Sequence, residues 1–153
     1  MPLRIWLHRQ LPQIWLSRGP MAWLLAPVAL VHGAVLALRH WLYHTGLKTS
    51  HRLPVRVIVV GNVVAGGAGK TPVTMALVQH LSRQGLRVGV ISRGHGRDTR
   101  DTREVQADSS PQSVGDEPLL IRQKTGVPVW VGASRVEAGR ALLDQHPWVD
   151  TLV

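Results

Sequence analysis

The spacing of hydrophobic positions changes along the chain and divides it into two parts. Met21 to Leu38 is an uncharged, mostly apolar run, which as a helix would reach about 27 Å, just short of a bilayer hydrocarbon core of about 30 Å. After Leu53 and Pro54, short β-branched runs alternate with segments of helical period. We therefore expect a helical N-terminal segment over residues 1–54 and a separate domain over residues 55–153.

The second part reads as alternating strands and helices. Strands are predicted at residues 55–60, 88–92, 127–131 and 149–153, and helices at 73–84, 117–124 and 134–145. The first strand reads as buried, and the polar stretch 98–113 is expected to be a loop. Such alternation predicts an α/β fold with a parallel sheet and flanking helices.

Basic and acidic residues are unevenly distributed. The net charge is +9, yet the first acidic residue of the chain is Asp98. Four of the six tryptophans lie in the first 41 residues. A strongly basic chain favours anionic partners: nucleic acid, phospholipid or a phosphorylated substrate. The absence of cysteine excludes a disulfide scaffold, a cysteine-ligated metal site and a thiol nucleophile.

The N-terminal part has the pattern of a membrane-surface element. Apolar side chains ahead of the uncharged run fall at helical spacing, and basic residues bracket the run at Arg18 and Arg39. A basic, tryptophan-rich, apolar segment fits a lipid surface better than nucleic acid. A buried core helix and a cleaved signal peptide are the alternatives. The pattern does not distinguish a spanning helix from one lying in a single leaflet.

A glycine-rich loop follows the first predicted strand. Gly61 to Pro72 reads GNVVAGGAGKTP and leads directly into a predicted helix. Strand, glycine loop, Lys-Thr and helix form the context of a phosphate-binding P-loop. Glycines let backbone N–H groups surround phosphate oxygens, Lys70 can reach the β- and γ-phosphates, and Thr71 can bind Mg²⁺. The alternative is a glycine-rich turn with an exposed lysine.

The loop departs from the strict Walker A pattern. That pattern requires glycine at position 64, where this chain has Val64. The sequence instead resembles the deviant x-G-G-x-G-K-T loop of a subgroup of P-loop ATPases and GTPases. That subgroup often carries a signature lysine where this chain has Ala65.

Two further motifs combine glycine with charge. Arg93 and Arg97 lie on a glycine-rich loop after the second strand, at the strand end that faces the ligand crevice in open α/β sheets. They suit phosphate contacts, or form a solvated basic loop. Asp116 and Glu117 open the next helix. They are either a general base with a metal or water ligand, or an ordinary acidic helix start.

Taken together, the motifs resemble the tetraacyldisaccharide 4′-kinases, the lipid A 4′-kinases of Gram-negative bacteria. The segments that carry the resemblance are Gly61 to Pro72, Ser92 to Gly96, Val114 to Pro118 and Val129 to Arg135. The resemblance implies an enzyme on the cytoplasmic face of the inner membrane. It would transfer the γ-phosphoryl group of ATP to the 4′-hydroxyl of a lipid disaccharide 1-phosphate.

The resemblance also implies roles for single residues. Asp116 would be the base on the acceptor hydroxyl, Glu117 a magnesium or water ligand, and Arg93 a contact to one of the phosphates, while Lys70 would assist transfer. MgATP would be held by Gly66, Gly67, Ala68, Gly69, Lys70 and Thr71. No nucleic-acid partner and no obligate protein partner are implied.

The family pattern continues past this sequence. Its members carry an acidic D-D-G-x-Q-H motif just after the strand that begins here at Val149, so we expect this chain to be the N-terminal part of such a kinase. Two other functions stay open: a membrane-attached nucleotide-binding switch, and a P-loop enzyme with a soluble acceptor.

Overall fold

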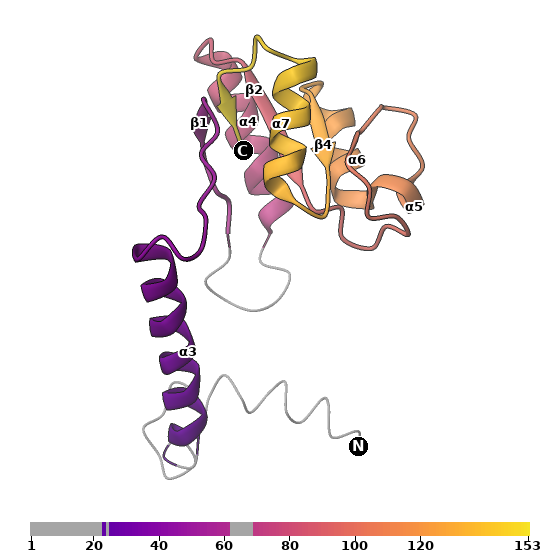
Figure 1. Ribbon diagram of the computed structural model, residues 1–153. Helices are drawn as coiled ribbons and strands as arrows, with labels where there is room; N and C mark the ends of the chain where they lie inside the picture. The colour runs from indigo at the N-terminus through magenta and orange to yellow at the C-terminus, as the bar shows by residue number, and fades with distance from the viewer. Residues whose placement is uncertain (1–22, 24, 62–68) are drawn as a thin grey trace, which may run out of the picture. The chain divides into compact units, whose positions relative to one another are not determined.

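The computed structural model describes residues 23, 25–61 and 69–153, and Figure 1 shows their ribbon. Contacts between Cα atoms divide the chain into two compact units, Met1–Ser50 and His51–Val153. Each unit is described by itself.

The described part of the first unit is dominated by one helix, α3, which runs from Ala26 to His44. Pro27 lies in its first turn, where the missing N–H costs no helical hydrogen bond. No residue of α3 is buried, and its apolar side chains, including Leu30 with 75% of its surface exposed, face solvent. Within the described residues, no helix combines the length and apolar character needed to cross a bilayer.

The second unit is an α/β domain, as the alternation of patterns predicts. Its helices are α4 (Lys70–Arg83), α5 (Pro111–Val114), α6 (Asp116–Thr125) and α7 (Arg135–Gln145). Its strands are β1 (Arg56–Val57), β2 (Val88–Ser92), β3 (Arg103–Glu104), β4 (Val129–Val131) and β5 (Thr151–Leu152). The strand order is β1-β5-β2-β4-β3.

Most of the sheet is parallel. In register, Thr151 of β5 lies between Arg56 of β1 and Val88 of β2. Strand β2 also pairs in parallel with β4, with Ile91 opposite Trp130. Because parallel strands are joined by crossover helices, the carboxyl ends of β2 and β4 lie at one edge of the sheet, together with the loops that follow them.

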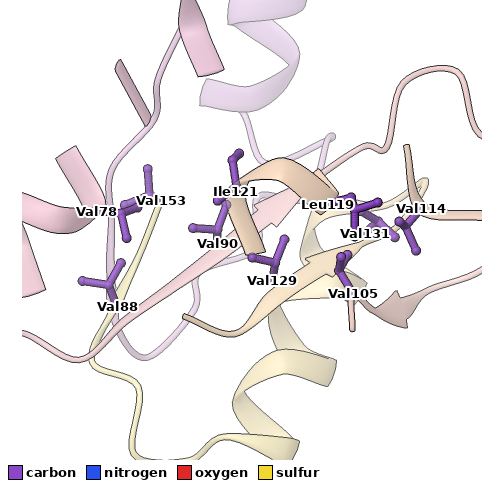
Figure 2. Packing of buried hydrophobic residues seen from close by; sticks show 10 residues of the cluster. All are labelled: Val78, Val88, Val90, Val105, Val114, Leu119, Ile121, Val129, Val131 and Val153. Carbon is purple, nitrogen blue, oxygen red and sulfur yellow. The ribbon is translucent and has the colours of Figure 1, made fainter. Parts of the chain in front are cut away.

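Alternate side chains of the strands pack on opposite faces. On one face Val88, Val90, Val129 and Val131 pack with residues of α4 and α6, as Figure 2 shows. On the other face Trp130 and Leu152 pack with Leu142 of α7. The period-two valines of β2 and β4 therefore set the central layer of a helix–sheet–helix sandwich.

The prediction of a loop over residues 98–113 was wrong in part. This stretch contains the antiparallel edge strand β3 and the one-turn helix α5. Val105, fully buried, anchors the segment, and its N–H donates to the Val129 carbonyl at 2.8 Å. A two-residue strand with one apolar anchor leaves no period in the sequence, which explains why the pattern missed it.

The prediction of a buried first strand was also wrong. Val57 of β1 retains 49% of its surface and Val59 retains 85%. Strand β1 stands at the edge of the described sheet and pairs on one side with β5. A β-branched run records strand propensity, but burial also depends on the neighbours, and these are not encoded in the run itself.

Asp150, just before β5, joins this strand to the start of β2. Its carboxylate accepts hydrogen bonds from the backbone N–H and the Nε of Arg87, at 3.1 and 3.2 Å, and from the Thr151 hydroxyl at 2.9 Å. Partial desolvation raises the pKa of Asp150, but the hydrogen bonds from Thr151 and Arg87 outweigh it and hold the pKa below its ordinary value of 3.8. The ionised form therefore stabilises the folded state.

We predict that Asp150→Asn lowers the free energy of unfolding at neutral pH. A lowered folded-state pKa gives stability that is present above the ordinary value of 3.8 and lost as the pH falls through the folded pKa. The gap between wild type and variant should therefore close in urea titrations below pH 3.8. Asp144→Asn, at an exposed position of α7, is the matched control and should change little. A gap that persists in acid would contradict the assignment.

Candidate functional site

The site begins at the first turn of α4. Gly69 adopts a left-handed conformation, with φ of 70°, and the helix starts at Lys70, three residues before the predicted start. Lys70 and Thr71 therefore lie in the first turn, where the helix dipole and free N–H groups favour an anion. The predicted phosphate-binding residues Gly66, Gly67 and Ala68 lie outside the described residues.

Two glycines bring the second and third motifs into backbone contact. Gly94 has φ of 66°, and a Cβ there would lie 2.8 Å from the Val114 carbonyl oxygen. Gly115 has φ of 91° and ψ of 150°, and its Cβ would lie 3.1 Å from the His95 carbonyl oxygen. Both conformations suit glycine, and both positions lack room for a side chain. The loop after β2 is thereby packed against the start of α6.

Hydrogen bonds extend this contact along both segments. The backbone N–H of Asp98 donates to the Gln112 carbonyl at 2.9 Å, and the Thr99 hydroxyl donates to the Ser113 carbonyl at 3.4 Å. The Ser92 hydroxyl accepts from the N–H of Gly94 at 3.3 Å. The segment with Arg93 and the segment with Asp116 and Glu117 consequently form one structural unit.

A polar cavity of about 660 Å³ opens at the carboxyl ends of β2 and β4. Among the described residues, its lining contains five permanent cations and a single carboxylate. The cations are Lys70, Arg93, Arg97, Arg100 and Arg135, and the carboxylate is Glu117. Such an excess of guanidinium groups makes the cavity a receptor for anions, phosphate groups in particular.

A smaller hollow of about 130 Å³ lies beside it, between the start of α4 and the start of α6. Lys70 and Glu117 line both spaces, and Thr71 and Thr74 add hydroxyl groups to the smaller one. Its oxygen donors are of the kind that Mg²⁺ prefers. Glu117 is the one carboxylate among the described residues that line this hollow, and nowhere in the described part of the chain are three His, Asp or Glu side chains grouped closely enough to hold a metal ion on their own.

Asp116 faces a third hollow, of about 210 Å³. His95 and Gly96 border both this hollow and the large cavity. The structure thus places Arg93 in the lining of the large cavity, Thr71 in that of the small hollow, and Lys70 and Glu117 in both. Asp116 lines the third hollow, on the other side of His95 and Gly96. Asp116 and Glu117 are both exposed in the first turn of α6.

The sequence interpretation missed the position of Arg100 in the cavity lining. This residue lies in the stretch predicted to be a loop, and no motif surrounds it. Arg135 was noted as part of a motif but was given no role, although it stands at the start of α7 and lines the cavity. Its position just beyond the carboxyl end of β4 is the signal that could have identified it.

Comparison with known proteins agrees with this geometry. The sequence model of the family described as tetraacyldisaccharide-1-P 4′-kinase matches residues 21–153. The chain belongs to this family.

Relatives in the family are similar over nearly the whole chain. The tetraacyldisaccharide 4′-kinase of Acidovorax sp. (strain JS42) is 57% identical over 96% of this chain and 44% of its own length. That of Leptothrix cholodnii is 52% identical over 96% of this chain and 42% of its own length. The chain therefore spans less than half the length of these curated kinases.

A solved kinase structure shares the fold. The crystal structure of LpxK from Aquifex aeolicus, described as an apo form in complex with ATP, superimposes with a TM-score of 0.68. It is 30% identical to this chain, and the match covers 84% of this chain and 41% of the Aquifex chain. The mostly parallel α/β sheet described above is thus the fold of a structurally characterised 4′-kinase.

The glycine contact gives a testable prediction for this family member. Gly115→Ala should lower the free energy of unfolding by about 1–3 kcal/mol, because alanine is strained at this φ and ψ and its Cβ meets the His95 carbonyl. Gly85→Ala is the control: Gly85 has φ of 83° but open space around a Cβ. Denaturant titration should show a larger loss at Gly115 than at Gly85. Equal losses would mean that the close approach contributes nothing beyond conformational strain.

Proposed function

We propose that this chain provides the nucleotide- and acceptor-binding site of a tetraacyldisaccharide 4′-kinase. The reaction is transfer of the γ-phosphoryl group of ATP to the 4′-hydroxyl of a lipid disaccharide 1-phosphate. The observation that carries the proposal is the cationic cavity at the start of α4, which is lined by Lys70, by the arginines of the loop after β2 and by Glu117 of α6. The family membership and the ATP named for the Aquifex enzyme support it.

The glycine loop and the start of α4 hold the triphosphate. By their sequence, Gly66, Gly67, Ala68 and Gly69 would offer backbone N–H groups to phosphate oxygens, in the manner of P-loops. Lys70 lies in the first turn of the helix and lines the cavity. Its ammonium group neutralises charge on the β- and γ-phosphates as the bond to the leaving group breaks.

Thr71 and Glu117 fit a magnesium ion. They line the same small hollow, and a hydroxyl with one carboxylate suits an ion that is completed by phosphate oxygens and water. A magnesium ion held there would offset negative charge on the phosphates. Glu117 from α6 and Thr71 from α4 would hold the ion.

Asp116 serves as the base, and Arg93 orients a phosphate group. The acceptor hydroxyl reaches Asp116 past His95 and Gly96, which border both the cavity and the Asp116 hollow. Asp116 takes the hydroxyl proton as the acceptor oxygen bonds to the γ-phosphorus. Phosphoryl transfer depends mainly on such positioning and on charge neutralisation.

The proposal predicts a loss of turnover in two variants of the full-length protein. With MgATP and a lipid disaccharide 1-phosphate in detergent micelles, Lys70→Ala should lower kcat by about a hundredfold or more, since a preorganised charge on the phosphates is lost. Asp116→Asn should lower kcat by about a hundredfold while ATP affinity is kept, since Asp116 acts on the acceptor. Mass spectrometry of the lipid measures transfer, and a fluorescent ATP analogue measures binding.

Arg140→Ala serves as the matched control, because Arg140 is exposed on α7 outside the cavity lining. It should leave both measurements unchanged. Full transfer by Asp116→Asn would remove Asp116 as the base. A folded wild-type protein that binds ATP but phosphorylates no lipid would favour the nucleotide-binding switch, and transfer to a soluble alcohol would favour the alternative enzyme.

We further propose that the protein works on the cytoplasmic face of the bacterial inner membrane and that α3 contacts the lipid surface. The apolar side chains of α3 are exposed, which is costly in water and favourable against lipid. Arg39 and Lys48 lie 5.8 and 5.4 Å from the ring centre of Tyr43. A tyrosine flanked by cations is typical of the zone where lipid headgroups meet water.

Val31 and Val35, one helical turn apart and both exposed, test this contact. The double variant Val31→Ser, Val35→Ser should bind phosphatidylglycerol-containing vesicles at least about tenfold more weakly, because each valine loses burial in lipid. Flotation on a density gradient measures the bound fraction. Leu120→Ser, on the exposed side of α6, should float as wild type. Unchanged flotation of the double variant would show that α3 does not contribute to lipid binding.

A further inference from the structure

The cavity holds more positive charge than a magnesium-bound triphosphate requires. In P-loop enzymes the glycine loop, its lysine and the helix start bind the nucleotide phosphates, and Lys70 is that lysine here. Among the described residues, Arg93, Arg97, Arg100 and Arg135 still face the same space against the single carboxylate of Glu117. Clustered guanidinium groups attract anions, so the cavity carries enough positive charge to bind a second anionic group beside the triphosphate.

Arg97 is fixed in place before any ligand binds. Its Nη2 donates to the Asp101 carbonyl at 2.6 Å, and its backbone N–H donates to the Gly94 carbonyl at 3.4 Å. Its Nη1 is buried and finds no hydrogen-bond partner among the described residues. The hydrogen bond to Asp101 therefore holds the guanidinium of Arg97 at the cavity lining, where a charged group can bind a phosphate oxygen in a charge-assisted hydrogen bond.

Arg97 and Arg100 lie on a loop that is hydrogen-bonded to the segment leading into Asp116. Between them, Asp98 and Thr99 hydrogen-bond to Gln112 and Ser113, which lead into Gly115 and Asp116. The loop that carries the arginines also borders the hollow of Asp116, through His95 and Gly96. An anion held by these arginines is therefore positioned relative to the base, while Lys70 lines the same cavity from α4.

We propose that Arg97 and Arg100 form a second anion subsite, which takes the phosphate group that the acceptor already carries. The inference rests on the proposed function and adds to it the recognition of the 1-phosphate named in the family description. Guanidinium groups fit phosphate oxygens in a two-bond geometry that an ammonium group cannot reproduce. Arg97 sets the position of the phosphate, and the exposed Arg100 closes on it from the rim of the cavity.

Arg100→Ala in the full-length protein tests the subsite with two acceptors. One is the lipid disaccharide 1-phosphate, and the other is the same disaccharide without its 1-phosphate. Wild type should prefer the phosphorylated acceptor in kcat/KM by about a hundredfold, the effect of losing charge-assisted hydrogen bonds. Arg100→Ala should lower kcat/KM for the phosphorylated acceptor about tenfold and leave that for the other acceptor, and the KM for ATP, unchanged.

Two controls keep the test independent of folding. Arg100→Lys should restore only part of the preference, because charge is kept and the two-bond geometry is lost. Arg140→Ala removes an exposed arginine of α7 outside the cavity lining and should keep the full preference. Inorganic phosphate, added as a competitor, should inhibit wild type against the lipid acceptor more strongly than it inhibits Arg100→Ala.

The outcomes separate this inference from the proposed function. If wild type phosphorylates neither acceptor, the kinase assignment fails. If wild type shows the preference and Arg100→Ala keeps it in full, or weakens both acceptors alike, the subsite is overturned. A raised KM for ATP in Arg100→Ala would assign Arg100 to the nucleotide and would equally overturn it.

Discussion

The close approach of two backbone segments, at Gly94 and Gly115, is the constraint on which the site depends. Neither position has room for a Cβ, and the conformation of Gly115 is essentially restricted to glycine. This contact lets the loop after β2 lie directly on the start of α6. Arginines from one segment and carboxylates from the other then share neighbouring spaces. The contact uses backbone rather than side chains, so the charged groups remain directed at a ligand.

A cationic cavity of this kind is unfavourable for the protein alone. Five permanent cations line it in the described part of the chain, with one carboxylate among them. The loss of stability is small because most of these side chains reach water, where repulsion between like charges is weak. Stability comes instead from the sandwich beneath, where buried valines of β2 and β4 pack on α4 and α6 (Figure 2). The fold thus separates the layer that stabilises the domain from the edge that binds anions.

How far the sequence predicts this molecule depends on how local each signal is. Lys70 and Thr71 are predicted as site residues because strand, glycine loop and helix start follow one another along the chain. Strands β2 and β4 and helices α4, α6 and α7 show their periods within single segments. Strand β3 shows none, since pairing with β4 and one buried valine define it. The Gly94 contact with Gly115 joins positions far apart in sequence, so Arg100 could not be associated with Asp116 before the structure placed them.

A kinase for a phosphorylated acceptor must bring two anions together, and the geometry suggests how this chain would do so. The proposed ATP site lies at the start of α4, which begins at Lys70. The proposed acceptor subsite lies on the arginine loop after β2. The glycine contact and two hydrogen bonds hold this loop against the segment that begins α6. Lys70 of α4 and the arginines of the loop line one cavity, so each of the two anions would be neutralised by its own set of groups. Repulsion between the reactants is thereby offset before transfer begins.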